Sequence, residues 1–202
     1  MGFRSSSDPA SGVEFVASDP RSFVPAVRNV VLRPARFFTG IRRRGDFVSP
    51  LVFAAVCYFV WVLIGGILTL TGVGAAEAGL LGEGILGFIG GLVISPVVAV
   101  ILALVFAAIL HAAVSYLVRP NSGFEATLRA ISYAFVVYLV AWIPVIGWIL
   151  ALYGLYLIFA GVRGMHGAAP REALISLVVL VVVAIILFAI LGGAAFGIFL
   201  GL

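Results

Sequence analysis

Residues 50–71, PLVFAAVCYFVWVLIGGILTLT, contain no charged side chain, and they decide the class of the fold. An α-helix rises about 1.5 Å per residue, so about 20 apolar residues cross a hydrocarbon core of about 30 Å. Pro50 suits the first turn of such a helix, and Gly72 suits its end. We therefore predict a first membrane span over 50–71.

The rest of the chain has the same character. Of its 202 residues, 64% are hydrophobic and 10% are charged, whereas globular domains average about 45–50% and about 25%. There is too little polar surface to cover a water-soluble core of this size. This composition argues against a soluble enzyme and against a nucleic-acid-binding protein. Helices are expected throughout, because a helix satisfies its own backbone hydrogen bonds in lipid.

Further apolar stretches predict the later spans. Residues 85–118 are too long for one perpendicular helix, and Pro96 divides them. We expect an interfacial or tilted piece over 84–94 and a span over 96–118, with one long kinked helix as the alternative. Three more spans are predicted over 125–142, 145–163 and 171–196. The expected fold is an all-α, polytopic helical membrane protein with five transmembrane helices within residues 50–202.

The charges predict how these spans are oriented. All twelve basic residues are arginine, and eight of them precede residue 45. With four acids through Asp46, the first 46 residues carry 8 − 4 = +4, and the remainder is neutral. The positive-inside rule then places the N-terminus in the cytoplasm and, after five spans, the C-terminus outside. The absence of lysine suggests a GC-rich genome, so we expect a multi-pass protein of a bacterial inner membrane.

The region before the first span divides into a tail and an arm. Residues 1–20 are rich in Ser, Asp, Pro and Gly, which predicts a disordered cytoplasmic tail. Residues 21–49 form a basic amphipathic juxtamembrane arm with helices expected over about 22–32 and 35–44. The arm could lie on the lipid surface or dock on the protein's own cytoplasmic face. The residues expected to contact the lipid surface are Arg33, Arg36, Phe37, Phe38, Arg42, Arg43 and Arg44.

Few residues within the spans carry chemistry. The sequence has no HExxH, CxxC or GxSxG motif and no glycine-rich phosphate loop, so we expect no catalytic, cofactor-binding or metal-binding residue. A polar path for a small solute would have to use Ser95, His111, Ser115, Ser132 and Tyr133. Close helix packing is expected at the small residues Gly87, Gly91, Gly193, Gly197 and Gly201. That packing would occur within the protein, with a second copy of it, or with another membrane protein.

Three segments carry a resemblance to a known family. They are residues 32–41 (LRPARFFTGI) followed by 49–51 (SPL), the run from Leu110 and His111 through 123–134 (GFEATLRAISYA), and 161–167 (GVRGMHG) followed by 171–173 (REA). In their order and spacing they resemble the Yip family of Ypt/Rab-interacting membrane proteins, in its bacterial form. The resemblance covers about residues 30–190. It implies a five-span helical membrane protein with a cytoplasmic N-terminus.

These observations favour one function over another. The expected function is that of a non-enzymatic integral membrane protein that organises membranes or scaffolds partners. Its expected contacts are the bilayer and the anionic headgroups at the cytoplasmic face, with no nucleic acid. The alternative is a small-solute permease or channel component, which would need a water-accessible cavity lined by the polar residues named above.

Overall fold

The computed structural model describes residues 14–72, 84–143 and 146–200, with the backbone alone at 148 and 191–200. Within these ranges every named regular element is a helix, as the sequence predicts. The elements are η2 (Pro20–Ser22), α1 (Phe23–Leu32), α2 (Pro34–Gly40), α3 (Val48–Leu70), α4 (Gly84–Leu117), α5 (Phe124–Ala134), η3 (Phe135–Leu139), α6 (Ile146–His166) and α7 (Pro170–Leu200).

Four of these helices are long and apolar enough to cross a membrane. They are α3, α4, α6 from Ile149 and α7 as far as Ile190. Their exposed faces carry many large apolar side chains, which a membrane protein turns toward lipid. The chain is therefore a multi-pass membrane protein.

Helix α4 corrects the predicted division of the second apolar run. The expected pieces over 84–94 and 96–118 form one continuous helix with Pro96 inside it, which is the alternative that the sequence left open. Pro96 supplies no backbone N–H, and the neighbouring Ser95 hydroxyl donates to the Leu92 carbonyl at 3.0 Å. Buried alanines recur along this helix, so neighbouring helices can approach it closely.

The predicted third span, 125–142, has a different structure. Its helical part is α5, which has 11 residues and is followed by the 3₁₀ turn η3. Residues 126–136 are all buried within the protein, so this segment contacts other helices rather than lipid. It is not among the four candidate spans, and the count of five is not confirmed. Glu125 and Arg129 make the first turns of this segment polar.

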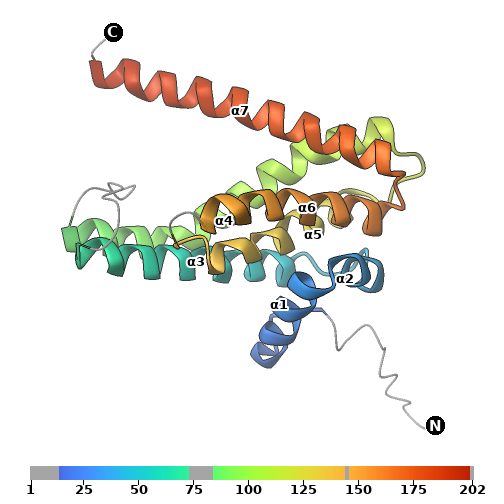
Figure 1. Ribbon diagram of the computed structural model, residues 1–202, viewed down its shortest axis with the longest axis horizontal. Helices are drawn as coiled ribbons and strands as arrows, with labels where there is room; N and C mark the ends of the chain where they lie inside the picture. The colour runs from blue at the N-terminus through green and yellow to red at the C-terminus, as the bar shows by residue number, and fades with distance from the viewer. Residues whose placement is uncertain (1–13, 73–83, 144–145, 201–202) are drawn as a thin grey trace.

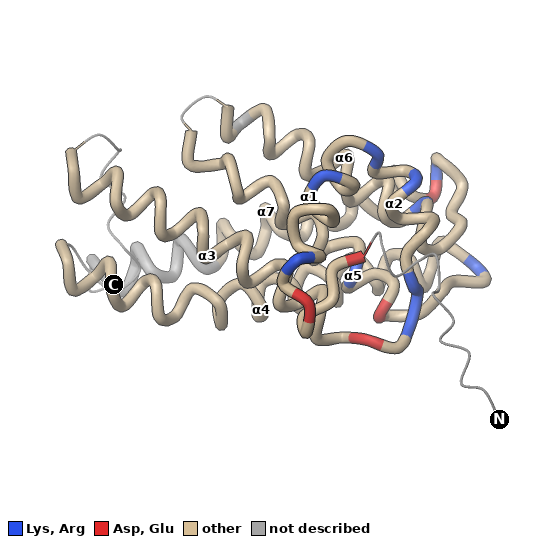
Figure 2. Tube along the Cα trace, turned by 90° about the horizontal axis from the view of Figure 1, so that it is seen from below, with Lys and Arg blue, Asp and Glu red and all other residues tan. Residues whose placement is uncertain are grey.

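The helices are arranged around α5 (Figure 1). Helices α3 and α4 run side by side, α6 lies along α5, and α7 packs against α4. Helices α1 and α2 lie at one end of this assembly, and α2 packs against α6. Figure 2 shows that the charged residues gather at the same end, which we call the charged end.

The N-terminal tail begins to fold earlier than predicted. Residues 14–20 were expected to be disordered, but Glu14 and Phe15 are buried at 8% and 4% exposure. The Phe15 ring packs against Phe23 and Phe53, each with ring centroids 5.8 Å apart. Residues 1–13 lie outside the described ranges. The segment is ordered because the Phe15 ring packs against helical residues and the Glu14 carboxylate pairs with Arg129 of α5.

Candidate functional site

Helix α5 brings two polar clusters together at the charged end of the molecule. Glu125, Arg129 and Tyr133 recur every fourth residue and therefore share one face. Thr127 is two residues from Arg129, about 200° around the helix, so it faces the other way. Each face binds a different set of segments.

The first cluster surrounds Arg129, whose side chain is fully buried. Its Nη1 pairs with Glu14 Oε1. Its Nη2 donates to the Asp46 carbonyl at 2.7 Å and to Glu125 Oε1 at 3.0 Å. A buried guanidinium is tolerated only when it is paired and hydrogen-bonded. Arg129 therefore fastens the tail and the segment before α3 to the central helix.

Acidic groups around Arg129 also fix the start of α3. Glu125 Oε1 accepts from the Asp46 main-chain N–H at 2.8 Å. Asp46 Oδ1 accepts from the main-chain N–H groups of Val48 and Ser49 at 2.9 and 3.0 Å, which stabilises the first turn of α3. Burial alone would raise the pKa of the Asp46 carboxyl. The hydrogen bonds from Ser49 and Val48 outweigh that effect and hold the pKa below its ordinary value.

The second cluster joins α4, α5 and α6 through two histidines. Thr127 Oγ1 lies 2.9 Å from His111 Nδ1 and 3.0 Å from His166 Nε2. The Ser122 main-chain N–H donates to His166 Nδ1 at 3.2 Å, so that nitrogen is an acceptor. A neutral His166 then carries its proton on Nε2 and donates to Thr127, whose hydroxyl donates to His111. The Thr127 hydroxyl therefore accepts one hydrogen bond, from His166, and donates another, to His111.

Sequence reasoning missed this pairing. It named His111 only among the residues of a possible polar path, yet the ring centroids of His111 and His166 are 6.4 Å apart. The available signal was Thr127, a hydroxyl placed opposite Arg129 on a short helix. Within the described ranges, no group of three His, Cys, Asp or Glu side chains is placed to hold a metal ion.

The histidine cluster gives a first prediction. Thr127→Val leaves His111 and His166 without their shared partner, so we expect a loss of about 1–3 kcal/mol in the free energy of unfolding. Denaturant titration of the purified protein in detergent measures this loss. Thr39→Val is the control, because the Thr39 hydroxyl bonds only carbonyls of its own helix at an exposed position. An equal effect of the two substitutions would contradict the role given to Thr127.

The arm is docked on the protein through α2. Phe37 and Phe38 are 1% and 0% exposed, so they pack in the protein core and do not insert into lipid, which corrects the lipid contact expected for them. Phe38 lies directly on Gly164 of α6, at a spot where a Cβ would stand 2.7 Å from the Phe38 Cβ. The Tyr153 hydroxyl also donates to the Val31 carbonyl at 2.6 Å. The glycine allows α2 to approach α6 this closely.

The arginines expected at the lipid surface have a different environment from the phenylalanines. Arg33, Arg36, Arg42, Arg43 and Arg44 are all exposed. Arg44 Nε donates to the Ser122 carbonyl at 3.4 Å, which joins the arm to the loop before α5. The docked arm thus places Phe37 and Phe38 inside and these arginines outside.

The glycines expected to pack helices lie in several places. Gly87 is buried in α4, and a Cβ at Gly91 would meet Val62 at 3.9 Å, an ordinary contact. Gly193 and Gly197 belong to the last turns of α7, but their surroundings lie outside the described part. Gly201 lies outside the described residues altogether.

The residues expected to form a polar path have separate local roles. Ser95 bonds its own helix, His111 bonds Thr127, and the Tyr133 hydroxyl donates to Glu14 at 3.5 Å. The Ser132 hydroxyl is buried without a hydrogen-bond partner in the described part of the chain, and Ser115 is half-buried on α4. These residues line neither of the two cavities described next.

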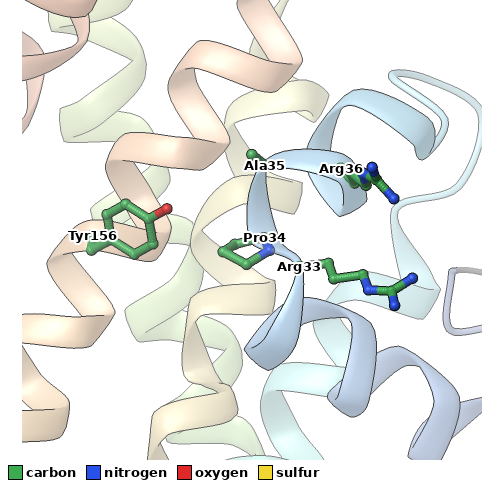
Figure 3. Close-up of a pocket in the computed structure, with 5 residues that line it drawn as sticks. All are labelled: Arg33, Pro34, Ala35, Arg36 and Tyr156. Carbon is green, nitrogen blue, oxygen red and sulfur yellow. The ribbon is translucent and has the colours of Figure 1, made fainter.

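Two shallow, open cavities adjoin each other between α2 and α6. One, of about 360 Å³, is lined by Arg33, Pro34, Ala35, Arg36 and Tyr156. The other, of about 320 Å³, shares Ala35 and Tyr156 and extends to Arg163 and Gly167. Figure 3 shows the Tyr156 ring pointing from α6 toward α2, while the Arg33 and Arg36 side chains extend from the other side of α2. We call the combined hollow the α2–α6 groove.

Comparison with known proteins identifies the family. The family model of the Yip1 domain matches residues 28–191, which include most of the arm, Arg129 and the histidine cluster, and the four candidate spans, but not Glu14. No curated protein and no solved structure matches the chain. Because the match covers most of the sequence, the chain belongs to the Yip1 domain family.

Proposed function

We propose that this protein is a non-enzymatic integral membrane protein that organises the membrane, or scaffolds partners, through its charged end. The observation that carries the proposal is the buried Arg129, which fastens the tail and the arm to the bundle. Because the arm is held there, its exposed arginines form a surface of fixed geometry. Such a surface suits anionic headgroups at the cytoplasmic face.

Both polar clusters support a structural role over a catalytic one. Arg129 and Thr127 form their hydrogen bonds with other residues of the protein. A catalytic group would instead be placed within reach of a substrate in a cavity. The residues of the α2–α6 groove come from neither cluster. We therefore assign the clusters to assembly of the charged end.

We further propose that the chain makes five passes, with α5 and η3 forming a short one, in a bacterial inner membrane. Helix α3 leaves the charged end and α4 returns to it, since His111 near the end of α4 meets Thr127. Helix α6 also returns there, because His166 meets Ser122. Helix α7 then leaves. If the charged end is cytoplasmic, this proposal puts the C-terminus outside whether α5 and α6 cross fully or only partly.

This topology is a second prediction. Reporter fusions at residues 45, 122 and 167 should report a cytoplasmic location, and fusions at 78 and 202 an external one. The reason is that the arginines flanking the spans resist translocation. A cytoplasmic reporter at residue 202 would overturn the proposed number of passes.

The function itself is tested by the lipids around the protein. Polymer-excised native patches of membrane containing the full chain should be enriched in anionic lipid relative to the bulk membrane, as measured by lipid mass spectrometry. Each arginine near an anionic surface contributes about 1 kcal/mol, or about fivefold in local affinity. Replacing Arg33, Arg36 and Arg43 together with glutamine should therefore remove most of the enrichment.

The control keeps the charge and changes the residue. Arg33→Lys, Arg36→Lys and Arg43→Lys together should retain the enrichment, because the surface potential depends on charge rather than on guanidinium geometry. Patches whose lipids match the bulk membrane in the wild-type protein would contradict the membrane-organising function.

A further inference from the structure

The outer face of α6 carries a stripe of apolar side chains that ends at one arginine, Arg163. Ile149, Leu152 and Tyr156 are 63%, 69% and 47% exposed, and Phe159 and Arg163 continue the same spacing of three and four residues. These positions share one face of the helix. The stripe is about 21 Å long at about 1.5 Å per residue, close to the length of an extended acyl chain. In a membrane this face is covered by lipid.

The charged end of this stripe is hollowed into the α2–α6 groove. Small residues line much of its second cavity: Ala160, Gly164, Gly167 and Ala168. The rings of Tyr156 and Phe159 also line this cavity, and its polar side-chain groups are those of Arg163 and Thr39 and the Tyr156 hydroxyl. The Thr39 hydroxyl already donates to the Ala35 carbonyl at 3.0 Å. Arg163 is therefore the one cationic donor among the residues that line this cavity.

Arg163 is oriented but not neutralised. Its guanidinium carbon lies 5.8 Å from the centroid of the Phe159 ring, within the range of a cation–π contact. Each acidic side chain in the described part of the chain already accepts a hydrogen bond elsewhere: Glu14, Asp19, Asp46, Glu125 and Glu172. None of them lines the groove. The anion that matches Arg163 must come from outside the described residues.

We infer that the α2–α6 groove binds one anionic phospholipid, with an acyl chain along the α6 stripe and the phosphate on Arg163. A phosphate accepts hydrogen bonds and a guanidinium donates them in a matching fork. The groove has no carboxylate for the ammonium of a zwitterionic headgroup, which favours an anionic lipid. Arg33 and Arg36 line the outer end of the groove but point away from Tyr156 (Figure 3), so they belong to the arm surface.

This inference deepens the proposed function and rests on it for the membrane placement of the charged end. It adds a single seated lipid to the general attraction of headgroups by the arm. The two are separable, because Arg163 holds the seated lipid while Arg33, Arg36 and Arg43 supply the surface charge.

Native mass spectrometry of the delipidated full chain in detergent tests the site. With dioleoyl phosphatidylglycerol added, we expect one retained lipid per chain, and weaker retention of dioleoyl phosphatidylcholine. Arg163→Gln should weaken the phosphatidylglycerol adduct about tenfold or more, because hydrogen bonds to charged groups are strong. Arg163→Lys should retain part of the affinity. Arg171→Gln removes an exposed arginine that lines neither cavity, and it should leave the adduct unchanged.

A groove-filling variant provides an independent arm of the test. Thr39→Trp should exclude the lipid, whereas Thr39→Ala should not. Both variants should keep the wild-type circular dichroism, because Thr39 is exposed. Retention of the adduct in both Arg163→Gln and Thr39→Trp would overturn the inference. So would equal binding of the two lipids, or binding of soluble glycerol phosphate as tight as that of phosphatidylglycerol. Arg43→Gln, at an exposed position that lines neither cavity, should keep the adduct while reducing the general enrichment.

Discussion

Arg129→Ala is expected to have the largest effect of any single substitution in the described part of the protein. It leaves the buried Glu14 carboxylate without its cation and removes two hydrogen bonds from Nη2. Breaking a buried ion pair on one side costs about 3–5 kcal/mol, because the remaining charge stays unpaired in a medium of low dielectric constant. We expect that loss in the free energy of unfolding, measured by denaturant titration in detergent.

The same substitution should also release the tail. Glu14 lies before η2 and α1, so losing its partner frees the segment that leads into the arm. Trypsin should then cut at Arg21 and Arg28 faster than in the wild-type protein. Arg171→Ala, at an exposed position, is the control and should change neither the stability nor the digestion pattern. Wild-type stability in Arg129→Ala would show that the cluster does not hold the charged end together.

Hydropathy predicted the membrane helices well where the sequence is uniformly apolar. The span predicted over 50–71 corresponds to α3 (Val48–Leu70). The span predicted over 145–163 overlaps α6 (Ile146–His166), and the one over 171–196 lies within α7 (Pro170–Leu200). These stretches carry few charges, so their length alone indicates a crossing. Pro96 misled the prediction, because the interior of a membrane helix can accommodate a proline that would end a helix in water.

The third segment was the hardest to predict. Its hydropathy resembles that of a span, yet residues 126–136 are buried within the protein and include a buried arginine. The partner of that arginine, Glu14, is 115 residues away in the sequence, in a stretch whose composition resembles that of a disordered tail. Local composition cannot report such a pair, because neither residue has a reason to be buried without the other.

The arm illustrates the same limit in another form. Its periodicity separated the apolar from the basic side correctly, since Phe37 and Phe38 are buried while Arg33 and Arg36 are exposed. Periodicity identifies the face that is buried, but it does not identify what covers that face. The covering surface is α6, and its signal was Gly164, where the absence of a side chain admits α2.

Gly164→Val should therefore separate the arm from the bundle. A Cβ at this position would stand 2.7 Å from the Phe38 Cβ, 2.9 Å from its carbonyl carbon and 3.2 Å from its carbonyl oxygen. Two of these atoms belong to the backbone of α2, so a change of side-chain rotamer cannot relieve the clash. Overpacking typically costs about 1–3 kcal/mol, and displacement of α2 would also expose Phe37 and Phe38. We expect lower stability and faster tryptic cleavage after Arg36; the bond after Arg33 precedes Pro34 and resists trypsin.

Gly65 offers a matched control within α3. A Cβ there would meet nothing within 4 Å, so Gly65→Ala should be neutral or should stabilise the helix by up to about 1 kcal/mol. Distances between spin labels on α2 and α6 distinguish arm release from general unfolding, because release lengthens those distances while the helix content stays constant. If Gly164→Val keeps the wild-type distances and cleavage rates, the arm tolerates a side chain at its contact with α6. The close approach of Phe38 to Gly164 would then not be what holds the exposed arginines in place.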